Sequence, residues 1–224
     1  MNVGAGAAFV MAFCYLFGFA LLLTAMNPGD TEGWSQLDRL AFLLERESLF
    51  QLWNLVIYVL FGLLLVALTT VLHRLLDRPD SIWMSIATPF GFIWAGLVIA
   101  SGMIANVGLT TVAELYTNKP DEAASLWSAL GVVQSGLGGG VEVVGGVWVL
   151  LISLWSLRSG IGLPKWLNVV GLLVGAAGML TIVPQLSGLG AVFGLAQIIW
   201  FLALGVVLFR VRTSPATNIS DARS

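Results

Sequence analysis

Charged residues are scarce in this sequence: Asp, Glu, Lys and Arg make up 10% of its 224 residues, whereas a soluble domain carries roughly a quarter. The net charge of -2 is too small to indicate a nucleic acid partner. Cysteine occurs once, as Cys14, so no intrachain disulfide can form. Histidine also occurs once, as His73, which excludes a haem held by two histidines of this chain. No cluster of His, Cys and carboxylates indicates a metal site, and no motif indicates a cofactor.

What the sequence has in abundance is apolar residues, which make up 58% of the chain and gather into long runs. A helix needs about 20 such residues to cross a ~30 Å hydrocarbon core. The sequence therefore predicts an all-α, polytopic integral membrane protein with six transmembrane helices. They span about residues 3–26, 49–72, 82–100, 121–157, 166–183 and 189–208. The first run is too long for the apolar part of a signal peptide, so we interpret it as a retained span.

Lysine and arginine are divided unequally between the two sides of this arrangement. One side carries seven of them, and the other carries three, Arg39, Arg46 and Lys119. Because Lys and Arg are enriched in cytoplasmic segments, we predict that both termini are cytoplasmic. Residues 1–211 then form one transmembrane domain, and residues 212–224 form a disordered cytoplasmic tail.

The segment 27–48 lies outside the membrane on this prediction, because it is too polar to span. Its apolar residues recur at helical spacing: Trp34, Leu37, Leu40, Ala41 and Leu44. This pattern is typical of an amphipathic helix lying in the membrane interface. A helix packed on the rest of the protein would show the same spacing, so both interpretations stay open.

The stretch from Gln134 to Gly146, QSGLGGGVEVVGG, is the most unusual part of the chain. As one helix, the span that contains it would be roughly 55 Å long, far beyond the bilayer core. Either its first turns project outside the membrane, or the helix breaks at Gly136–Gly140, as helices do at transporter binding sites. We favour the projecting helix, because its polar start matches a third span that also extends outward.

On one continuous helix, the small residues of this stretch share a face with Glu142. They are Ser135, Gly138, Gly139, Gly145 and Gly146. A stripe of small residues lets a second helix approach closely, so we assign the four glycines to helix packing and expect Glu142 to point at protein. A charged carboxylate near the middle of a span costs about 2.5 kcal/mol or more. Glu142 is therefore neutral, paired or hydrated, and is either a proton or ligand site or a hydrogen bond between helices.

The polar partners expected for Glu142 are those at a similar depth. Gln197 lies near the middle of its span, as do Tyr58 and Tyr15. No Lys or Arg lies deep enough for a salt bridge, so we predict a neutral Glu142–Gln197 hydrogen bond.

A second polar group lies in the outer halves of the spans. It comprises Gln134, Asn106 and Asn54. These residues would line an outward-facing vestibule beside a hydrated Glu114, or would form ordinary hydrogen bonds between helices.

The nine tryptophans fall into two groups. Six lie near predicted span ends, where aromatic residues form interfacial belts. The other three, Trp94, Trp148 and Trp200, lie deeper. They could wall an apolar pocket, but we expect them to face lipid.

Two stretches resemble a bacterial multi-pass membrane family, domain of unknown function 4386. ESLFQLWNLVIYVLFGLLLVALTTVLHRLL, from Glu47 to Leu76, resembles that family's second span, in which a short "sLF" precedes an apolar helix with a basic close. SGIGLPKWLNVVGLLVGAAGML, from Ser159 to Leu180, resembles its fifth span, which opens with "sGflPrwLGvl". The resemblance implies six spans with an extended outer first loop and no particular activity. We expect the protein in the bacterial inner (plasma) membrane.

Two functions of different classes fit these observations. In the first, the protein binds or transports a small apolar or weakly acidic molecule, with proton exchange at Glu142. In the second, it is a non-catalytic subunit of a homo-oligomer or larger membrane complex, packed through its glycines and its long outer hairpin. Catalysis is not expected, because the only histidine, His73, lies at a span end and no nucleophile is paired with a base.

Overall fold

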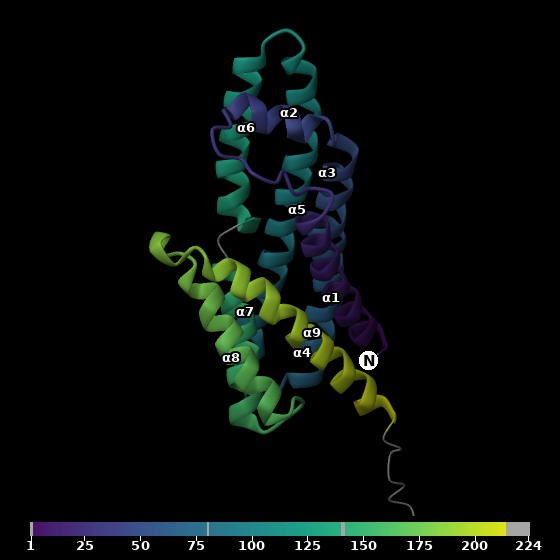
Figure 1. The fold of residues 1–224 in the computed structure, drawn as a ribbon. Coiled ribbons are helices and arrows are strands. Elements are labelled where there is room, and N and C mark those ends of the chain that lie inside the picture. The colour runs from purple at the N-terminus through teal and green to yellow at the C-terminus, as the bar shows by residue number, and fades with distance from the viewer. Residues whose placement is uncertain (1, 80, 140–141, 214–224) are drawn as a thin grey trace, which may run out of the picture.

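The described part of the chain, residues 2–79, 81–139 and 142–213 of a computed structural model, is built from helices and contains no strand (Figure 1). The α-helices are α1 (Asn2–Leu23), α2 (Gln36–Leu44), α3 (Glu47–Asn54), α4 (Phe61–Leu76), α5 (Trp83–Tyr116), α6 (Pro120–Gln134), α7 (Val143–Ser159), α8 (Lys165–Leu180) and α9 (Leu189–Thr213). Two π-helical turns, η1 (Leu55–Leu60) and η2 (Ser135–Gly139), and one 3-10 turn, η3 (Pro184–Leu186), join them. The predicted all-α class is confirmed.

Within the part of the chain that the structure describes, five stretches are long and apolar enough to cross a membrane: Asn2–Leu23, Glu47–Leu76, Trp83–Tyr116, Leu189–Arg210 and Pro120–Ser159, of which the last includes α6 and α7. They indicate a membrane protein. The sixth predicted span corresponds to α8, which is apolar but has only 16 residues. Of the predicted tail, residues 214–224 lie outside the described residues, whereas α9 continues to Thr213.

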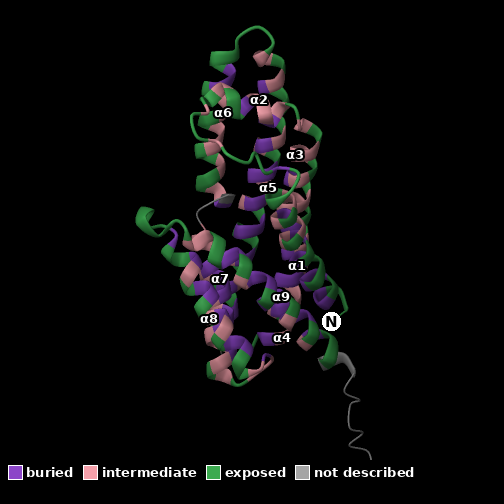
Figure 2. Cartoon of the chain, viewed as in Figure 1, coloured by how far each residue is buried: buried purple, intermediate pink, exposed green. Residues whose placement is uncertain are grey.

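The body of the molecule is a bundle in which six helices follow one another as neighbours around a closed ring. The order of contact is α1, α4, α5, α7, α8 and α9, and α9 packs again on α1. The residues buried inside this ring are mainly large and apolar, among them Leu65, Leu68, Trp148, Phe201 and Leu204. Figure 2 shows these buried positions concentrated where α7, α9 and α4 meet.

A helical hairpin formed by α5 and α6 projects beyond the body, and α2 lies across it (Figure 1). A second, smaller core joins the three helices: Leu40 from α2, Val112 from α5, and Ala123 and Ala124 from α6. Leu40 is only 1% exposed. The segment 27–48 therefore contains a helix packed on the protein, which is one of the two interpretations left open by its sequence.

Local sequence explains where α2 begins. Ser35 and Asp38 form a capping box, in which the Asp38 N–H donates to Ser35 Oγ at 3.2 Å and the Ser35 N–H donates to Asp38 Oδ2 at 2.8 Å. The Ser35 hydroxyl also donates to Asp38 Oδ2, at 2.7 Å. Together the hydroxyl and the N–H of Ser35 hold the pKa of the Asp38 carboxyl below its ordinary value of 3.8.

The span predicted at 121–157 is interrupted, so the continuous helix favoured from the sequence is wrong. Gly138 has a φ of 109°, outside the helical range, and α7 begins only at Val143. Glycine adopts positive φ at little cost, and a run of glycines disfavours a helix. The first half, α6, does project outward, but residues on either side of the break belong to different helices. Ser135 and Gly138 therefore do not share one helical face with Gly145 and Gly146.

Candidate ligand-binding cavity

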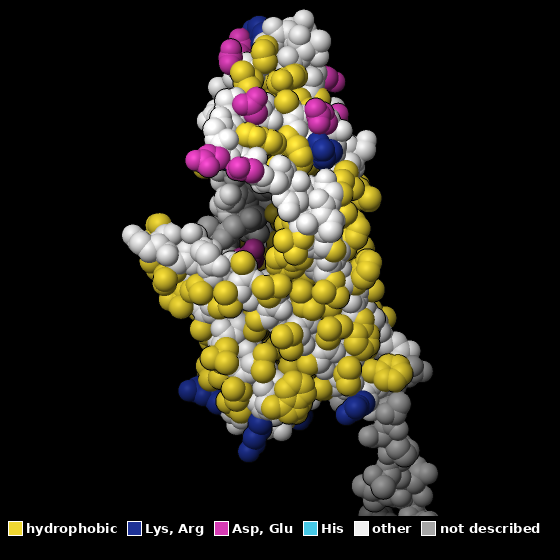
Figure 3. Space-filling model, in the orientation of Figure 1, with side chains coloured by type: hydrophobic (Ala, Val, Ile, Leu, Met, Phe, Trp, Pro, Cys, Tyr) yellow, Lys and Arg dark blue, Asp and Glu magenta, His cyan; other side chains and the backbone are white. Residues whose placement is uncertain are grey.

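A cavity of about 310 Å³ opens between the body and the projecting hairpin. Helices α1, α3, α4, α5 and α9 line it together with the two π-helical turns. Six of its side chains are aromatic: Tyr15, Phe19, Trp53, Tyr58, Phe61 and Trp94. Among the described residues that line it, Glu142 is the only charged one. Figure 3 shows this face hollowed below the hairpin, with an acidic side chain inside the hollow.

Both interruptions of helical geometry border this cavity. Ile57 and Tyr58 belong to η1, and Gly138 belongs to η2; all three are lining residues. A π-helical turn inserts an extra residue into a helix and is frequent at functional sites. The irregular backbone of η1 and η2 thus forms part of the cavity wall.

Glu142 directly precedes α7, and its backbone is fixed between two helices. Its N–H donates to Thr181 Oγ1 at 2.8 Å, and that hydroxyl donates in turn to the Gly178 carbonyl at 2.7 Å, at the end of α8. Its carbonyl accepts from the Gly146 N–H at 2.8 Å. The side chain makes no capping hydrogen bond to α7 and instead lines the cavity. Among the described residues, we find no hydrogen-bond donor to its carboxylate.

The aromatic side chains support one another around the cavity. Tyr15 meets Phe61 edge to face, with ring centroids 5.3 Å apart, and Phe61 meets Trp94 at 5.5 Å. Trp53 meets Tyr58 at 5.9 Å, and the Trp53 Nε1–H donates to the Gly18 carbonyl at 3.1 Å. Rings held by neighbouring rings and by a hydrogen bond form a preorganised wall.

The cavity lies toward the acidic end of the bundle rather than at its middle. Tyr58 precedes Arg74 by 16 residues, and Glu142 precedes Arg158 by the same number, which is about 24 Å along a helix. The expected position of Glu142 in the middle of one long helix is therefore wrong. It was counted along an unbroken helix, whereas the break makes Glu142 the last residue before the start of α7.

Two of the three predicted partners of Glu142 lie in the cavity with it. Tyr58 and Tyr15 line the same cavity. Gln197 does not: it is fully buried in α9, and neither its Nε2 nor its Oε1 has a hydrogen-bond partner among the residues that the structure describes. The predicted Glu142–Gln197 hydrogen bond is thus not formed.

The polar residues of the outer halves also lie away from the cavity. Asn106 Nδ2 donates to the Gln51 carbonyl at 3.1 Å, which ties α5 to α3. The Gln134 carbonyl accepts from Ser101 Oγ at 3.3 Å. Glu114 is exposed, as expected for a hydrated residue. Asn106 makes a hydrogen bond between helices, and neither Asn106 nor Gln134 lines the cavity.

The four glycines assigned to helix packing have different surroundings. A Cβ at Gly146 would lie 2.6–2.9 Å from backbone atoms of α8, and one at Gly145 would lie 2.5 Å from the Trp94 ring. Gly138 lies at the break and lines the cavity. Gly139 belongs to η2, and its surroundings lie outside the described residues. Gly145 and Gly146 are thus at close helix contacts, whereas Gly138 is at a turn.

Sequence reasoning missed the role of the deep tryptophans. Trp94, Trp148 and Trp200 are at most 2% exposed and form a chain of rings 5.8 and 6.0 Å apart, so the prediction that they face lipid is wrong. Glycines make room for them: Gly145 lies against Trp94, Gly91 against Trp148 and Gly171 against Trp200. Glycines on other helices at matching depth were the signal that could have found them.

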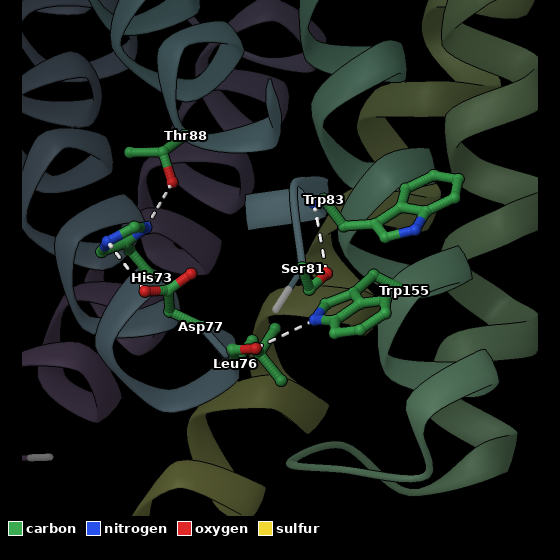
Figure 4. Close-up of polar contacts among 7 residues, drawn as sticks. All are labelled: His73, Leu76, Asp77, Ser81, Trp83, Thr88 and Trp155. Atoms are coloured by element: carbon green, nitrogen blue, oxygen red, sulfur yellow. Dashed lines mark hydrogen bonds and ion pairs between the residues drawn. The ribbon is translucent and has the colours of Figure 1, made fainter. Parts of the chain in front are cut away.

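The opposite, basic end of the bundle is closed by ordinary polar contacts (Figure 4). His73 Nδ1 lies 2.9 Å from Thr88 Oγ1, and its Nε2 lies 3.9 Å from Asp77. The Trp155 Nε1–H donates to the Leu76 carbonyl at 2.9 Å, and its ring stacks on Trp83. Within the described ranges, no three His, Cys, Asp or Glu residues are grouped as metal ligands.

Comparison with protein-family models matches residues 4–211 to a domain of unknown function, DUF4386. No curated protein and no solved structure matches the chain.

Proposed function

The chain belongs to the DUF4386 family, whose function is unknown, and we propose from the cavity itself that the protein binds a small, mainly apolar molecule at Glu142. The observation that carries this proposal is an aromatic-walled cavity with one carboxylate for which the described residues provide no hydrogen-bond donor. A carboxylate that faces an interior cavity of a membrane protein is a candidate for a functional site because its burial is costly.

The shape and lining of the cavity support binding. Its volume of about 310 Å³ is at the lower end of the range for small-molecule pockets, which are mostly apolar with a few placed polar groups. Here the polar groups are the Glu142 carboxylate, the Tyr15 and Tyr58 hydroxyls and Ser187. Toward the basic end the bundle is filled by its core. Binding thus needs no rearrangement, whereas transport with proton exchange at Glu142 would require this core to open.

We propose six spans, with the basic end in the cytoplasm and the protein in the bacterial inner membrane. Both α7 and α9 run from the acidic end to the basic end, so α8, which connects them, must run back across the membrane. Lys and Arg gather at the lower end of the molecule in Figure 3, and most Asp and Glu gather around the hairpin. By the preference of Lys and Arg for the cytoplasm, the cavity then opens outward.

A second candidate function is that of a non-catalytic subunit of a larger membrane complex. A groove on the hairpin supports it, lined by Met103, Ile104, Val107, Gly108, Thr111, Leu126 and Leu130. Val107 is 67% exposed and lies 24 residues beyond Trp83, about 36 Å along α5, which exceeds the ~30 Å hydrocarbon core. An apolar groove outside the core is typical of a contact with another protein.

Native mass spectrometry of the gently solubilised protein tests both functions. Wild type is compared with Glu142→Gln, and Glu114→Gln is the matched control because it removes an exposed carboxylate away from the cavity. We expect a non-lipid mass on wild type and on Glu114→Gln that Glu142→Gln lacks. Partner chains bound equally to all three proteins, with no small ligand, would instead identify an assembly subunit and refute the binding proposal.

A further inference from the structure

Resting on the proposed binding function, we propose that the molecule held in this cavity is an amphiphilic organic cation, such as an aromatic amine or a quaternary ammonium compound. Three features of the cavity support this class of ligand: the charge of the lining, its aromatic character and the position of Glu142.

The charge of the lining excludes an anion. Glu142 is acidic, and no Lys, Arg or His is among the described residues that line the cavity. An anionic or weakly acidic occupant would place a negative charge beside Glu142 with no counter-charge in the wall. A cation would neutralise the carboxylate inside an apolar surface, which is the condition under which buried charges are tolerated.

The aromatic character of the wall favours a cation over a neutral molecule. The faces of Trp, Tyr and Phe rings attract cations, Trp most strongly, within about 6 Å of the ring centroid. The six aromatic side chains come from four neighbouring segments, α1, α3, the η1–α4 junction and α5, so the rings form one continuous aromatic wall of the cavity. Neighbouring pairs such as Trp53 and Tyr58, 5.9 Å apart, are spaced so that one alkylammonium group can reach both.

The Glu142 carboxylate provides a counter-charge for the cation beside the aromatic wall. It directly precedes α7, where the helix dipole favours a negative charge. Its backbone is held by Thr181 and Gly146, and the carboxylate is not used to cap the helix. A fixed backbone with an uncommitted carboxylate beside aromatic faces is suited to hold the head of a cation, while Phe19, Ile57 and Leu22 receive its apolar part.

The test uses three probes of similar size, one positively charged, one uncharged and one negatively charged. Each is added to the full chain in phosphatidylcholine nanodiscs. They are benzyltrimethylammonium, its uncharged carbon isostere neopentylbenzene, and the anion 3-phenylpropanoate. Binding is measured by titration calorimetry, with empty nanodiscs subtracted. We expect the cation to bind about tenfold or more tightly than the isostere, and the anion not to bind.

Variants assign the binding to the cavity. Glu142→Gln should lower the affinity for the cation about tenfold or more and should change the affinity for the isostere by no more than about twofold. Glu114→Gln should change neither affinity. Trp53→Leu should lower the affinity for the cation severalfold. It replaces Glu142→Gln as the test if thermal unfolding shows that Glu142→Gln is misfolded.

Two results would overturn the inference, and they are distinguishable. If the isostere or the anion binds at least as tightly as the cation, and Trp53→Leu weakens it, the cavity binds ligand but the cation class is wrong. If none of the three probes shows binding that depends on Glu142 or Trp53, the proposed binding function fails as well.

Discussion

Replacing Gly146 by alanine tests the packing on which the cavity depends. The added Cβ would lie 2.6 Å from the Met179 nitrogen, 2.7 Å from the Gly175 carbonyl oxygen and 2.9 Å from the Gly178 carbonyl carbon. Real Cβ atoms essentially never come within 3.0 Å of other heavy atoms. All three atoms belong to the backbone of α8, which cannot turn aside as a side chain can. The variant must therefore push α7 and α8 apart.

The expected cost follows from the behaviour of overpacked interiors. Forcing a methyl group into a tight contact destabilises a protein by about 1–3 kcal/mol. For a chain of this size each kcal/mol lowers Tm by about 2–4 °C. Gly146→Ala should thus lower Tm by about 2–12 °C. The reason is the separation of the two helix backbones, and a larger residue should lower Tm further.

Gly96→Ala is the matched control. Gly96 also lies inside a membrane helix, α5, but a Cβ there would meet nothing within 4 Å, and alanine favours a helix by up to about 1 kcal/mol over glycine. Thermal unfolding in one detergent, followed by tryptophan fluorescence, measures both variants. If Gly146→Ala unfolds at the same temperature as wild type or Gly96→Ala, the close contact of α7 and α8 described above is refuted.

Three further perturbations have defined outcomes. Gln197→Met should raise stability by about 1–3 kcal/mol in chemical unfolding, because it removes a buried amide that lacks partners; a loss of stability would mean that the amide is bonded. Acid should weaken the capping of α2: the lowered pKa of Asp38 contributes stability that is complete above its ordinary value of 3.8 and is lost as pH falls through the lowered folded value. The exchange rate of the α2 amide hydrogens, corrected for intrinsic rates, should therefore be constant from neutral pH to about 5 and should rise in more acidic solution. Asp38→Asn should abolish this rise. Trp155→Phe should cost about 0.5–1.5 kcal/mol through loss of its hydrogen bond to Leu76, whereas Trp166→Phe, at an exposed position, should be neutral in the same unfolding assay.

The helices of the body could be predicted from sequence because lipid leaves the backbone few choices. A chain in hydrocarbon must satisfy its N–H and C=O groups internally, so an apolar run becomes a helix. The run at 189–208 matches α9 at its start, and the run at 166–183 matches α8 within a few residues. What the runs could not show is which apolar face meets protein. Lipid and protein interior are both apolar, so Trp94 and Trp200 gave no periodic signal of burial.

The cavity was beyond prediction because it depends on contacts between distant residues. The glycines around Gly138 permit a break in the helix but do not require one. The structure adds the hydrogen bond from the Glu142 N–H to Thr181, 39 residues later in the chain, which no local pattern reveals. Depth counted along an unbroken helix then paired Glu142 with Gln197, whereas Tyr58, to which the same count gave a similar depth, does line the cavity with Glu142.

The unequal lengths of the helices have a consequence for the surrounding bilayer. Helices α7 and α8 have 17 and 16 residues, about 25 Å each, whereas the hydrocarbon core is ~30 Å thick. A bilayer meets a short hydrophobic surface by thinning beside it. On the proposed six-span arrangement, lipid headgroups beside α7 and α8 would lie several ångströms nearer the basic end than those beside α5, at the level where α7 begins. Molecules that collect among these headgroups would then lie at the level of Glu142, which directly precedes α7 and lines the cavity.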